Sequence, residues 1–323
     1  MRFVTYSHRG AVRTGLLSTE RDVVDLTRAL DLHYRLAGSS NAAALAAAIS
    51  PAGDLRGFLE GGSRSLEDAA GALGSARSRL SQDRERCRAE GLLFDAAEVT
   101  LLAPLTRPGK VACMWVNYPA HGVEVAVETP QTDPVFFAKF PDVVIGPGAP
   151  IVLPPISRQV DYEAELAVVI GKQAKDVPEE RALDYIVGYT IMNDVSARDF
   201  NLDRVVGATA PYVIQKTFDS FAPLGPALVT ADEVGDPQTL SIRLWVDGEL
   251  LQDGNTRQMQ HKIPRIVSYL SKVVTLRPGD VIATGTPPGA GHWRKPPRYL
   301  QPGNTVRIEI PPLGVLENPV AAA

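Results

Sequence analysis

The chain has 323 residues, 45% hydrophobic and 22% charged, which is ordinary for a globular protein with one large core or two smaller ones. Its formal net charge of −4 at pH 7 argues against a general nucleic-acid binder, which needs a basic face. Two cysteines, Cys87 and Cys113, are too few for a disulfide framework and fit a reducing compartment. Arg2 and His8 interrupt the first ten residues, which therefore lack the apolar core expected of a signal peptide. No stretch reaches the roughly 20 apolar residues of a membrane span. We therefore expect a cytoplasmic protein that binds neither nucleic acid nor membrane.

The first hundred residues predict a hairpin followed by helices. The residues His8 to Gly10 are the turn candidate of the hairpin. Ser65 is placed to cap the last helix, and Gly91 follows its end. Four apolar residues recur every seven positions along that helix and predict one buried stripe. They are Leu66, Leu73, Leu80 and Cys87. The predicted elements are strands at Phe3–Tyr6 and Ala11–Leu17 and helices at Glu20–Leu36, Asn41–Ile49 and Ser65–Glu90.

A turn-rich segment, Ala103–Gly109, separates this part from a strand-rich remainder. We expect an N-terminal domain at residues 1–105 and a catalytic domain at residues 106–323. The strand-rich part also contains one predicted helix, Lys262–Lys272, with a single apolar face. Its predicted strands are Val111–Val116, Val160–Ile170, Ala182–Met192, Leu240–Val246, Val281–Thr284 and Thr305–Ile310.

Acidic residues on the predicted strand Val160–Ile170 suggest a metal site. Alternate side chains share a face, so Glu163 and Glu165 project together, about 7 Å apart. Such a pair usually lies on a solvated face beside basic residues, but on a buried strand unpaired carboxylates are costly. Asp194 ends the next apolar run, and three carboxylates favour Mg²⁺ or Mn²⁺ over zinc. Asp199 is a weaker candidate for a fourth ligand; otherwise it caps a helix or pairs with an arginine.

Four segments in a fixed order make the sequence resemble the fumarylacetoacetate hydrolase family. They are Asp161–Gly171, Gly188–Asp199, Lys216–Pro226 and Pro278–Pro287. The resemblance covers about residues 105–320, whereas the N-terminal third is only loosely similar to the small leading domain of that family. It implies an α+β, mainly β fold, in which a mixed β-sandwich roll follows a smaller N-terminal α/β domain, and it implies a homodimer.

The same resemblance implies a metal-dependent active site. Glu163, Glu165 and Asp194 would hold one Mg²⁺, with Mn²⁺ or Ca²⁺ as alternatives. The substrates in that family are small oxo acids or diketones that chelate the metal through neighbouring oxygens.

The segment Asn117–Glu124 matches the N-Y-x-x-H-x-x-E lid pattern of the family. Pro119 fits the first turn of a helix, which puts His121 and Glu124 one turn apart. A carboxylate bonded to one imidazole nitrogen leaves the other free to take a proton from water. By itself H-x-x-E is a frequent chance pattern. The resemblance assigns His121 and Glu124 as the water-activating dyad and Tyr118 as a substrate-binding residue.

Four further residues complete the expected site, two of them through the resemblance. Lys216 alone predicts a strand end that reaches for water, but the family match makes it a cation beside the metal that stabilises an enolate or oxyanion. Arg198 would pair with the acids or with a substrate carboxylate. Gln252 matches a substrate-facing glutamine, or it is a hairpin-edge residue. Thr286, in the tight turn Thr284–Pro287, could bind a carboxylate together with nearby backbone N–H groups.

Departures from the family pattern concern the substrate side of the site. The segment Pro288–Trp293 is bulkier than the usual Gly-Val-Gly turn, so His292 either lines a modified pocket or lies at the surface. Met114 and Trp115 stand where small residues are common. These changes affect the expected substrate more than the expected metal.

The sequence predicts a metal-dependent hydrolase that cleaves a carbon–carbon bond in a small oxo acid or β-diketone, such as an acylpyruvate, in the degradation of aromatic compounds. His121 would deprotonate the attacking water, and Lys216 would stabilise the leaving enolate. A decarboxylase (a lyase), hydratase or isomerase of a 2-oxo acid on the same metal site is the alternative. A non-catalytic binding protein with the same fold is a third hypothesis.

Overall fold

The computed structural model describes residues 1–19, 21–126, 132–200 and 212–323. Its helices are α1 (Leu26–Leu36), α2 (Ala42–Ile49), α3 (Leu55–Glu60), α4 (Gly62–Gln82), α5 (Arg84–Ala89), α6 (Pro119–Glu124), α7 (Tyr212–Lys216), α8 (Ala231–Val234) and α9 (Ile263–Val273). Its strands are β1 (Arg2–His8), β2 (Ala11–Thr19), β3 (Asp22–Asp25), β4 (Leu93–Asp95), β5 (Thr100–Leu102), β6 (Val111–Met114), β7 (Phe136–Lys139), β8 (Val144–Ile145), β9 (Ile151–Leu153), β10 (Val160–Asp161), β11 (Ala164–Ile170), β12 (Ile186–Asn193), β13 (Ser196–Ala197), β14 (Ala222–Thr230), β15 (Ser241–Val246), β16 (Glu249–Asn255), β17 (Val281–Ala283), β18 (Thr305–Ile310) and β19 (Gly314–Ala322). None of these helices is both long and apolar enough to cross a membrane.

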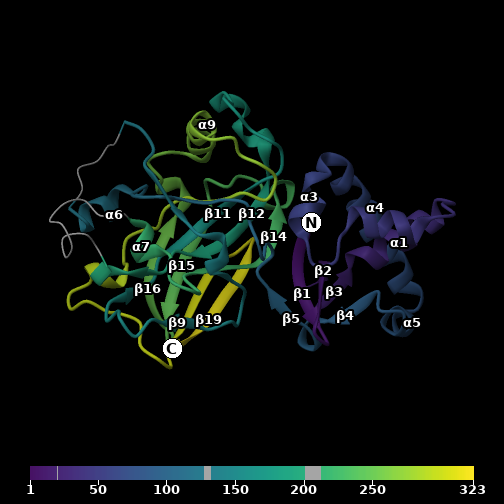
Figure 1. Ribbon diagram of the computed structural model, residues 1–323, viewed down its shortest axis with the longest axis horizontal. Helices are drawn as coiled ribbons and strands as arrows, with labels where there is room; N and C mark the ends of the chain where they lie inside the picture. The colour runs from purple at the N-terminus through teal and green to yellow at the C-terminus, as the bar shows by residue number, and fades with distance from the viewer. Residues whose placement is uncertain (20, 127–131, 201–211) are drawn as a thin grey trace.

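Most strands belong to one large mixed sheet with the order β4-β3-β2-β1-β14-β12-β11-β17-β6-β7. A second sheet has the order β16-β15-β18-β19-β9, and β10 pairs with β13. Helices α1, α3, α4 and α5 gather at one end of the molecule, and α6 and α7 lie at the other (Figure 1). This segregation of helices and sheets confirms the predicted α+β class. Because β1 pairs with β14, the large sheet runs across residue 105, and the domain boundary there stays a prediction.

The N-terminal hairpin forms as predicted, but the first helix begins later than expected. Arg9 and Gly10 both have positive φ, 51° and 81°, as a two-residue hairpin turn requires. The predicted helix Glu20–Leu36 is wrong in its first part, because 22–25 form β3, which pairs with β2 and β4. Glu20 lies outside the described residues. Asp25 caps α1 by accepting a hydrogen bond from the Arg28 N–H at 2.8 Å, so the helix starts only after it.

The predicted long helix Ser65–Glu90 is two helices, α4 and α5. Asp83 leaves the helical conformation, with φ −153°, and its side chain caps α5 by accepting from the Arg86 N–H at 2.9 Å. Ser65 lies inside α4 and is not its cap, because α4 begins three residues earlier. Gly91 follows α5 with φ +69°, as expected of the residue after a helix. The predicted apolar stripe packs against the core.

In the C-terminal part, β11 places the predicted acids. The expected strand Val160–Ile170 is interrupted, since Tyr162 and Glu163 separate β10 from β11. The expected strand Ala182–Met192 begins only at Ile186, after a 3₁₀ segment. Every residue of β11 is buried between β12 and β17. Its side chains alternate between two apolar clusters, one of which includes residues of the N-terminal helices. The helix α9 confirms the prediction at Lys262–Lys272.

Candidate active site

Three carboxylates converge where β11 begins and β12 ends. One oxygen each from Glu163, Glu165 and Asp194 lies within 4.8 Å of the others, and all three residues are buried. The antiparallel pairing of Ala164 with Asn193 brings the two strand ends together. The Asp194 N–H donates to the Glu163 carbonyl at 2.8 Å, and the Glu163 N–H donates to the Asn193 side chain at 3.0 Å. The backbone therefore fixes the acids before any ligand binds.

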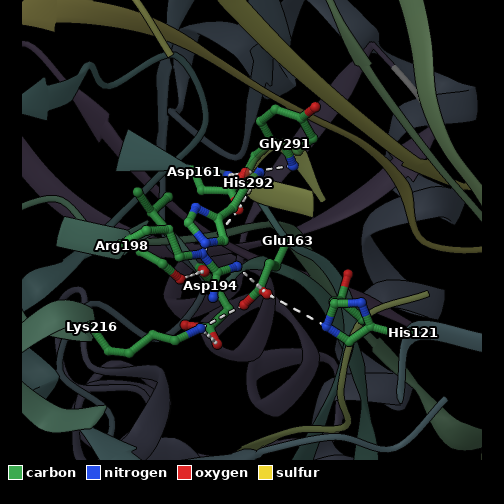
Figure 2. Close-up of polar contacts among 12 residues, drawn as sticks. His121, Asp161, Glu163, Asp194, Arg198, Lys216, Gly291 and His292 are labelled. Atoms are coloured by element: carbon green, nitrogen blue, oxygen red, sulfur yellow. Dashed lines mark hydrogen bonds and ion pairs between the residues drawn. The ribbon is translucent and has the colours of Figure 1, made fainter. Parts of the chain in front are cut away.

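Two predicted cations contact these acids (Figure 2). Lys216 Nζ donates to Glu163 Oε2 at 2.5 Å and to Asp194 Oδ2 at 2.6 Å. Arg198 donates through Nη2 to Glu163 Oε1 at 2.5 Å and through Nε to Asp161 Oδ2 at 3.0 Å. Lys216 lies beside the three carboxylates, and its predicted role at an enolate or oxyanion stays a prediction. Arg198 pairs with acids, which is one of its two expected roles, and its contact with a substrate carboxylate stays a prediction.

Lys139, at the end of β7, was missed by sequence reasoning. Its side chain is 0% exposed, and Nζ lies 2.7 Å from Asp194 Oδ1. Nζ also donates to the backbone carbonyls of Val195, Lys216 and Phe221 at 2.7–2.9 Å. A lysine at the end of a short apolar strand normally extends its ammonium group into solvent, so no local pattern reveals the contact with Asp194. Lys139 joins three segments behind the acidic cluster.

Asp161 is a second residue that sequence reasoning left without a role. It is fully buried and bonds Arg198 on one side and the backbone of residues 291 and 292 on the other. Asp199, by contrast, is not part of the three-carboxylate group. Its carboxylate accepts from Ser157 Oγ at 2.6 Å and from the Arg158 N–H at 2.8 Å.

The pKa values of Glu163 and Glu165 are shifted in opposite directions. Burial raises the pKa of Glu165 well above its usual value, and the Asp194 and Glu163 carboxylates raise it further. Burial also acts on Glu163, but Arg198 and Lys216 outweigh it and hold the pKa of Glu163 well below its usual range. Burial would lower the pKa of Lys216, yet Asp194 and Glu163 raise it above its ordinary value. The cluster therefore keeps Lys216 charged and leaves Glu165 short of positive charge.

The donor set fits a hard divalent cation. In their charged forms four buried carboxylates face three cations, which leaves one negative charge. They are Asp161, Glu163, Glu165 and Asp194, and Lys139, Arg198 and Lys216. Among the described residues Glu165 forms no ion pair, and its carboxylate accepts from the Gly285 N–H at 2.6 Å. Asp194 contacts a cation through each oxygen, Lys139 through Oδ1 and Lys216 through Oδ2. Carboxylate oxygens of this kind suit Mg²⁺, Mn²⁺ or Ca²⁺.

The predicted dyad stands beside the acids on α6. Pro119 occupies the first turn, and His121 Nδ1 lies 3.0 Å from Glu124 Oε2. His121 Nε2 is 4.0 Å from Glu163 Oε1, so the imidazole bridges the Glu124 carboxylate and the acidic cluster (Figure 2). The Gly289 N–H donates to both oxygens of Glu124, at 2.9 and 3.1 Å, and fixes that carboxylate. This geometry leaves Nε2 as the nitrogen that can exchange a proton with a substrate.

Gln252 and Thr286 support the start of β11. The Gln252 side chain accepts from the Ala164 N–H at 2.9 Å and donates to Thr286 Oγ1 at 2.8 Å and to the Pro287 carbonyl at 2.7 Å. The Thr286 hydroxyl donates to the Ala164 carbonyl at 2.9 Å. Substrate contacts of both residues stay predictions. In the turn before Thr286, the Gly285 N–H binds Glu165, so this backbone donor holds a predicted metal ligand.

Tyr118 lies directly before α6 and is 1% exposed. Its hydroxyl has no hydrogen-bond partner within the described part of the chain. Burial raises the pKa of Tyr118, and the Glu165 carboxylate raises it further, so the phenol stays protonated. The predicted contact of Tyr118 with substrate stays a prediction, and its unpaired hydroxyl is consistent with it.

Comparison with known proteins agrees with this geometry. Residues 110–321 match the family model described as Fumarylacetoacetate (FAA) hydrolase C-terminal. The Xenopus laevis protein named oxaloacetate tautomerase fahd2, mitochondrial, is 46% identical over 266 residues, which cover 82% of this chain and 78% of that protein. The family match, residues 110–321, includes the strand-rich part that carries the site.

Solved structures resemble the whole chain. Maleylpyruvate hydrolase from Sphingobium sp. SYK-6, in complex with manganese (II) ion and pyruvate, is 31% identical with a TM-score of 0.72, and the match covers 100% of both chains. 5-Carboxymethyl-2-hydroxymuconate delta-isomerase from Mycobacterium smegmatis is also 31% identical, with a TM-score of 0.70 and 100% of both chains covered. These proteins share the expected fold, and their names describe different reactions on related small acids.

Proposed function

Because this chain belongs to the fumarylacetoacetate hydrolase family, we propose that it is a divalent-metal-dependent enzyme that interconverts the keto and enol forms of a small 2-oxo diacid such as oxaloacetate. The observation that carries the proposal is the His121 imidazole, held by Glu124 and directed at the acidic cluster with Nε2 4.0 Å from Glu163. The name of the Xenopus laevis relative supports the substrate and the reaction. This reaction is the isomerase alternative of the sequence analysis.

The chemistry moves one proton between a carbon and the neighbouring oxo oxygen. His121 takes the proton from the carbon next to the 2-oxo group through Nε2, while Glu124 accepts the hydrogen bond from Nδ1–H and stabilises the resulting imidazolium. Lys216 stabilises the negative charge that develops on the oxygen. The Tyr118 hydroxyl, buried without a partner among the described residues, is available to donate to that oxygen. The proton on His121 then passes to the oxygen of the enolate, which completes the enol.

The metal ligands in this proposal are Glu163, Glu165 and Asp194, and Mg²⁺ is the proposed ion. When bound, a divalent ion supplies Lewis-acid polarisation of the 2-oxo group. Arg198 and Lys139 position the ligands, Arg198 through Glu163 and Lys139 through Asp194. The name of the manganese complex from Sphingobium supports Mn²⁺ as a substitute.

Carbon–carbon bond hydrolysis is the second candidate. The similarity to maleylpyruvate hydrolase favours it, and the same dyad could deprotonate a water instead of a carbon acid. The two reactions differ in one requirement, since hydrolysis needs a water bound between His121 and the substrate carbonyl. The role in the degradation of aromatic compounds stays a prediction tied to this candidate.

One preparation distinguishes the candidates. Purified protein is mixed with enolic oxaloacetate in the presence of Mg²⁺ or of EDTA, and the loss of enol absorbance is followed. The same preparation is incubated with maleylpyruvate and acetylpyruvate, and cleavage products are separated by chromatography. We expect Mg²⁺-dependent ketonisation without cleavage. Cleavage of an acylpyruvate without faster ketonisation would establish the second candidate, and neither reaction with Mg²⁺ or Mn²⁺ would favour the non-catalytic hypothesis.

His121→Asn tests the assigned base. We expect ketonisation to slow by about a hundredfold or more, because a positioned acid–base group contributes that much to the rate. The affinity for Mg²⁺, measured by titration calorimetry, should stay within threefold, since His121 is not a ligand in this proposal. A variant with full activity would exclude His121 as the base.

The proposal includes assembly and location. We propose a homodimer that binds only a small oxo acid, which light scattering after size-exclusion chromatography tests. The predicted location is cytoplasmic, whereas the Xenopus laevis relative is named as mitochondrial, so the location of this protein stays a prediction.

A further inference from the structure

His292 belongs to a short segment that is tied to the site through its backbone. The Gly291 N–H donates to Asp161 Oδ1 at 2.7 Å, and the His292 N–H donates to Asp161 Oδ2 at 3.1 Å. Asp161 in turn bonds Arg198, which bonds Glu163. Figure 2 shows the His292 imidazole beside Arg198, with His121 on the other side of Glu163. Because the backbone makes the attachment to Asp161, the ring is left for another contact.

The ring is oriented by two aromatic neighbours. His292 Nδ1 lies 2.8 Å from the Tyr299 hydroxyl, and the ring packs edge-on against Trp293 with centroids 4.5 Å apart. Burial raises the pKa of Tyr299, and Asp161 adds to the rise, so the phenol stays protonated and is able to donate to Nδ1. In that tautomer the ring proton lies on Nε2, which has no hydrogen-bond partner among the described residues.

The ring is a neutral donor at pH 7. Burial lowers the pKa of His292, and the Arg198 guanidinium lowers it further. Arg198 itself is already bonded to Asp161 and Glu163. A second carboxylate of a substrate therefore needs another donor on this side of the site.

We propose that His292 determines specificity by binding, through Nε2–H, the distal carboxylate of a 2-oxo diacid, the end remote from its chelating oxygens. The inference rests on the proposed function for the class of substrate. His292 is a binding residue here and takes no part in proton transfer, which His121 performs. Tyr299 is a positioning residue that acts through His292.

The test compares two ligands that differ only at the distal end. Oxaloacetate and 2-oxobutanoate both have four carbons, and the second has a methyl group in place of the distal carboxylate. Their dissociation constants are measured by titration calorimetry on the Mg²⁺-loaded protein, which needs no turnover. The quantity of interest is the ratio of the two constants. We expect the unaltered protein to prefer oxaloacetate.

His292→Phe keeps an aromatic ring against Trp293 and removes both nitrogens. We expect the preference for oxaloacetate to fall by about ten- to a hundredfold, which is what a hydrogen bond to a charged group supplies. His292→Gln keeps a donor and should retain most of the preference. Tyr299→Phe keeps the imidazole but removes the hydroxyl that selects the Nε2–H tautomer. The preference for oxaloacetate should therefore fall by an intermediate amount.

His33→Phe is the matched control. His33 in α1 is also half-buried, and its Nδ1 lies 3.1 Å from the Ser75 hydroxyl, but it lies among the N-terminal helices α1 to α5. This variant should leave the preference unchanged. Thermal unfolding of every variant confirms that it is folded before binding is measured.

An unchanged preference in His292→Phe, or equal weakening of both ligands, would overturn the inference, as would an unaltered protein without preference for oxaloacetate. If the preference depends on His292 but enolic oxaloacetate is not ketonised faster, the proposed function fails and this inference stands. If ketonisation is fast and the preference does not depend on His292, the reverse holds.

Discussion

Helices α1, α3, α4 and α5 lie at one end of the molecule and α6 and α7, which contribute to the candidate active site, lie at the other (Figure 1). Charged side chains have different surroundings in these two regions. In the helical layer formed by α1 to α5, Arg35 pairs with Asp31 and has a side chain 65% exposed. In the candidate active site, the side chains of Lys139 and Glu163 are 0% and 6% exposed. Exposed pairs contribute little to stability, whereas a buried charge costs several kcal/mol unless it is paired.

The comparison shows that folding and chemistry use different residues here. Phe58 of α3 is fully buried against Phe3 of β1, and this apolar contact needs no charge. The site instead buries charges that an apolar core would not need. Changes in the helical layer should therefore alter the free energy of unfolding and spare metal binding, whereas changes among the acids should alter metal binding.

Glu165→Gln should have the largest effect. We expect the affinity for Mg²⁺ to fall by more than about a hundredfold, since loss of a ligand should exceed the loss caused by an outer-shell partner. The metal-free variant should unfold at a higher temperature, because burial and Asp194 disfavour the ionised glutamate. Calorimetric titration and thermal unfolding in EDTA measure both. Glu67→Gln, on the exposed face of α4, is the control. Unaltered Mg²⁺ affinity in Glu165→Gln would contradict the metal site.

Lys139→Met should destabilise the protein by about 3–5 kcal/mol, the cost of breaking a buried charge pair. The substitution removes the donor to three backbone carbonyls and the partner of Asp194. Urea unfolding measures the loss of stability. The affinity for Mg²⁺ should fall as well, because Lys139 positions Asp194. Lys272→Met, at an exposed position of α9, should change stability by less than about 0.5 kcal/mol. Equal effects of the two lysines would show that burial of Lys139 has no energetic consequence.

Phe58→Ala should destabilise the helical layer without affecting the site. We expect a loss of about 3–5 kcal/mol, because a large fully buried aromatic leaves a cavity. The dissociation constant for Mg²⁺ should stay within threefold in the folded variant. Leu36→Ala, at a side chain 70% exposed, is the control. A large change in Mg²⁺ affinity would show that the two ends of the molecule are coupled.

Arg35→Ala should have the smallest effect, below about 0.5 kcal/mol, because an exposed i,i+4 ion pair contributes only that much. Urea unfolding with low and high salt measures it, and salt should remove most of the difference. A loss of several kcal/mol would mean that the helical layer also depends on its charges.

Part of the site follows from local spacing. Glu163 and Glu165 are two positions apart, and His121 and Glu124 are one helical turn apart, so their proximity can be predicted from the chain alone. The details differ, since Glu163 lies in the break before β11 and not within the strand. The resemblance to a family adds Asp194 and Lys216, which local periodicity could not join to the glutamates.

Breaks in secondary structure were harder to predict. Asp83 interrupts a helix whose apolar stripe continues through it, because its side chain caps the next helix. Residues 22–25 have a strand conformation that pairing with β2 and β4 stabilises, although their sequence also fits the start of a helix. In both cases a competing local or tertiary hydrogen bond decided the conformation.

The amino-acid sequence alone determined the class of fold and pointed to the group of three acidic residues and to the histidine–glutamate pair, since each depends on periodicity or on a recognisable ordered motif. Only the tertiary structure showed that Lys139 and Asp161 hold the acids and that His292 lies beside Arg198. The contacts of Lys139 with Asp194 and of Asp161 with Gly291 join residues far apart in the chain. Such contacts leave no local pattern, because the partners are distant in the chain, and many of them are backbone carbonyl and amide groups that every residue possesses.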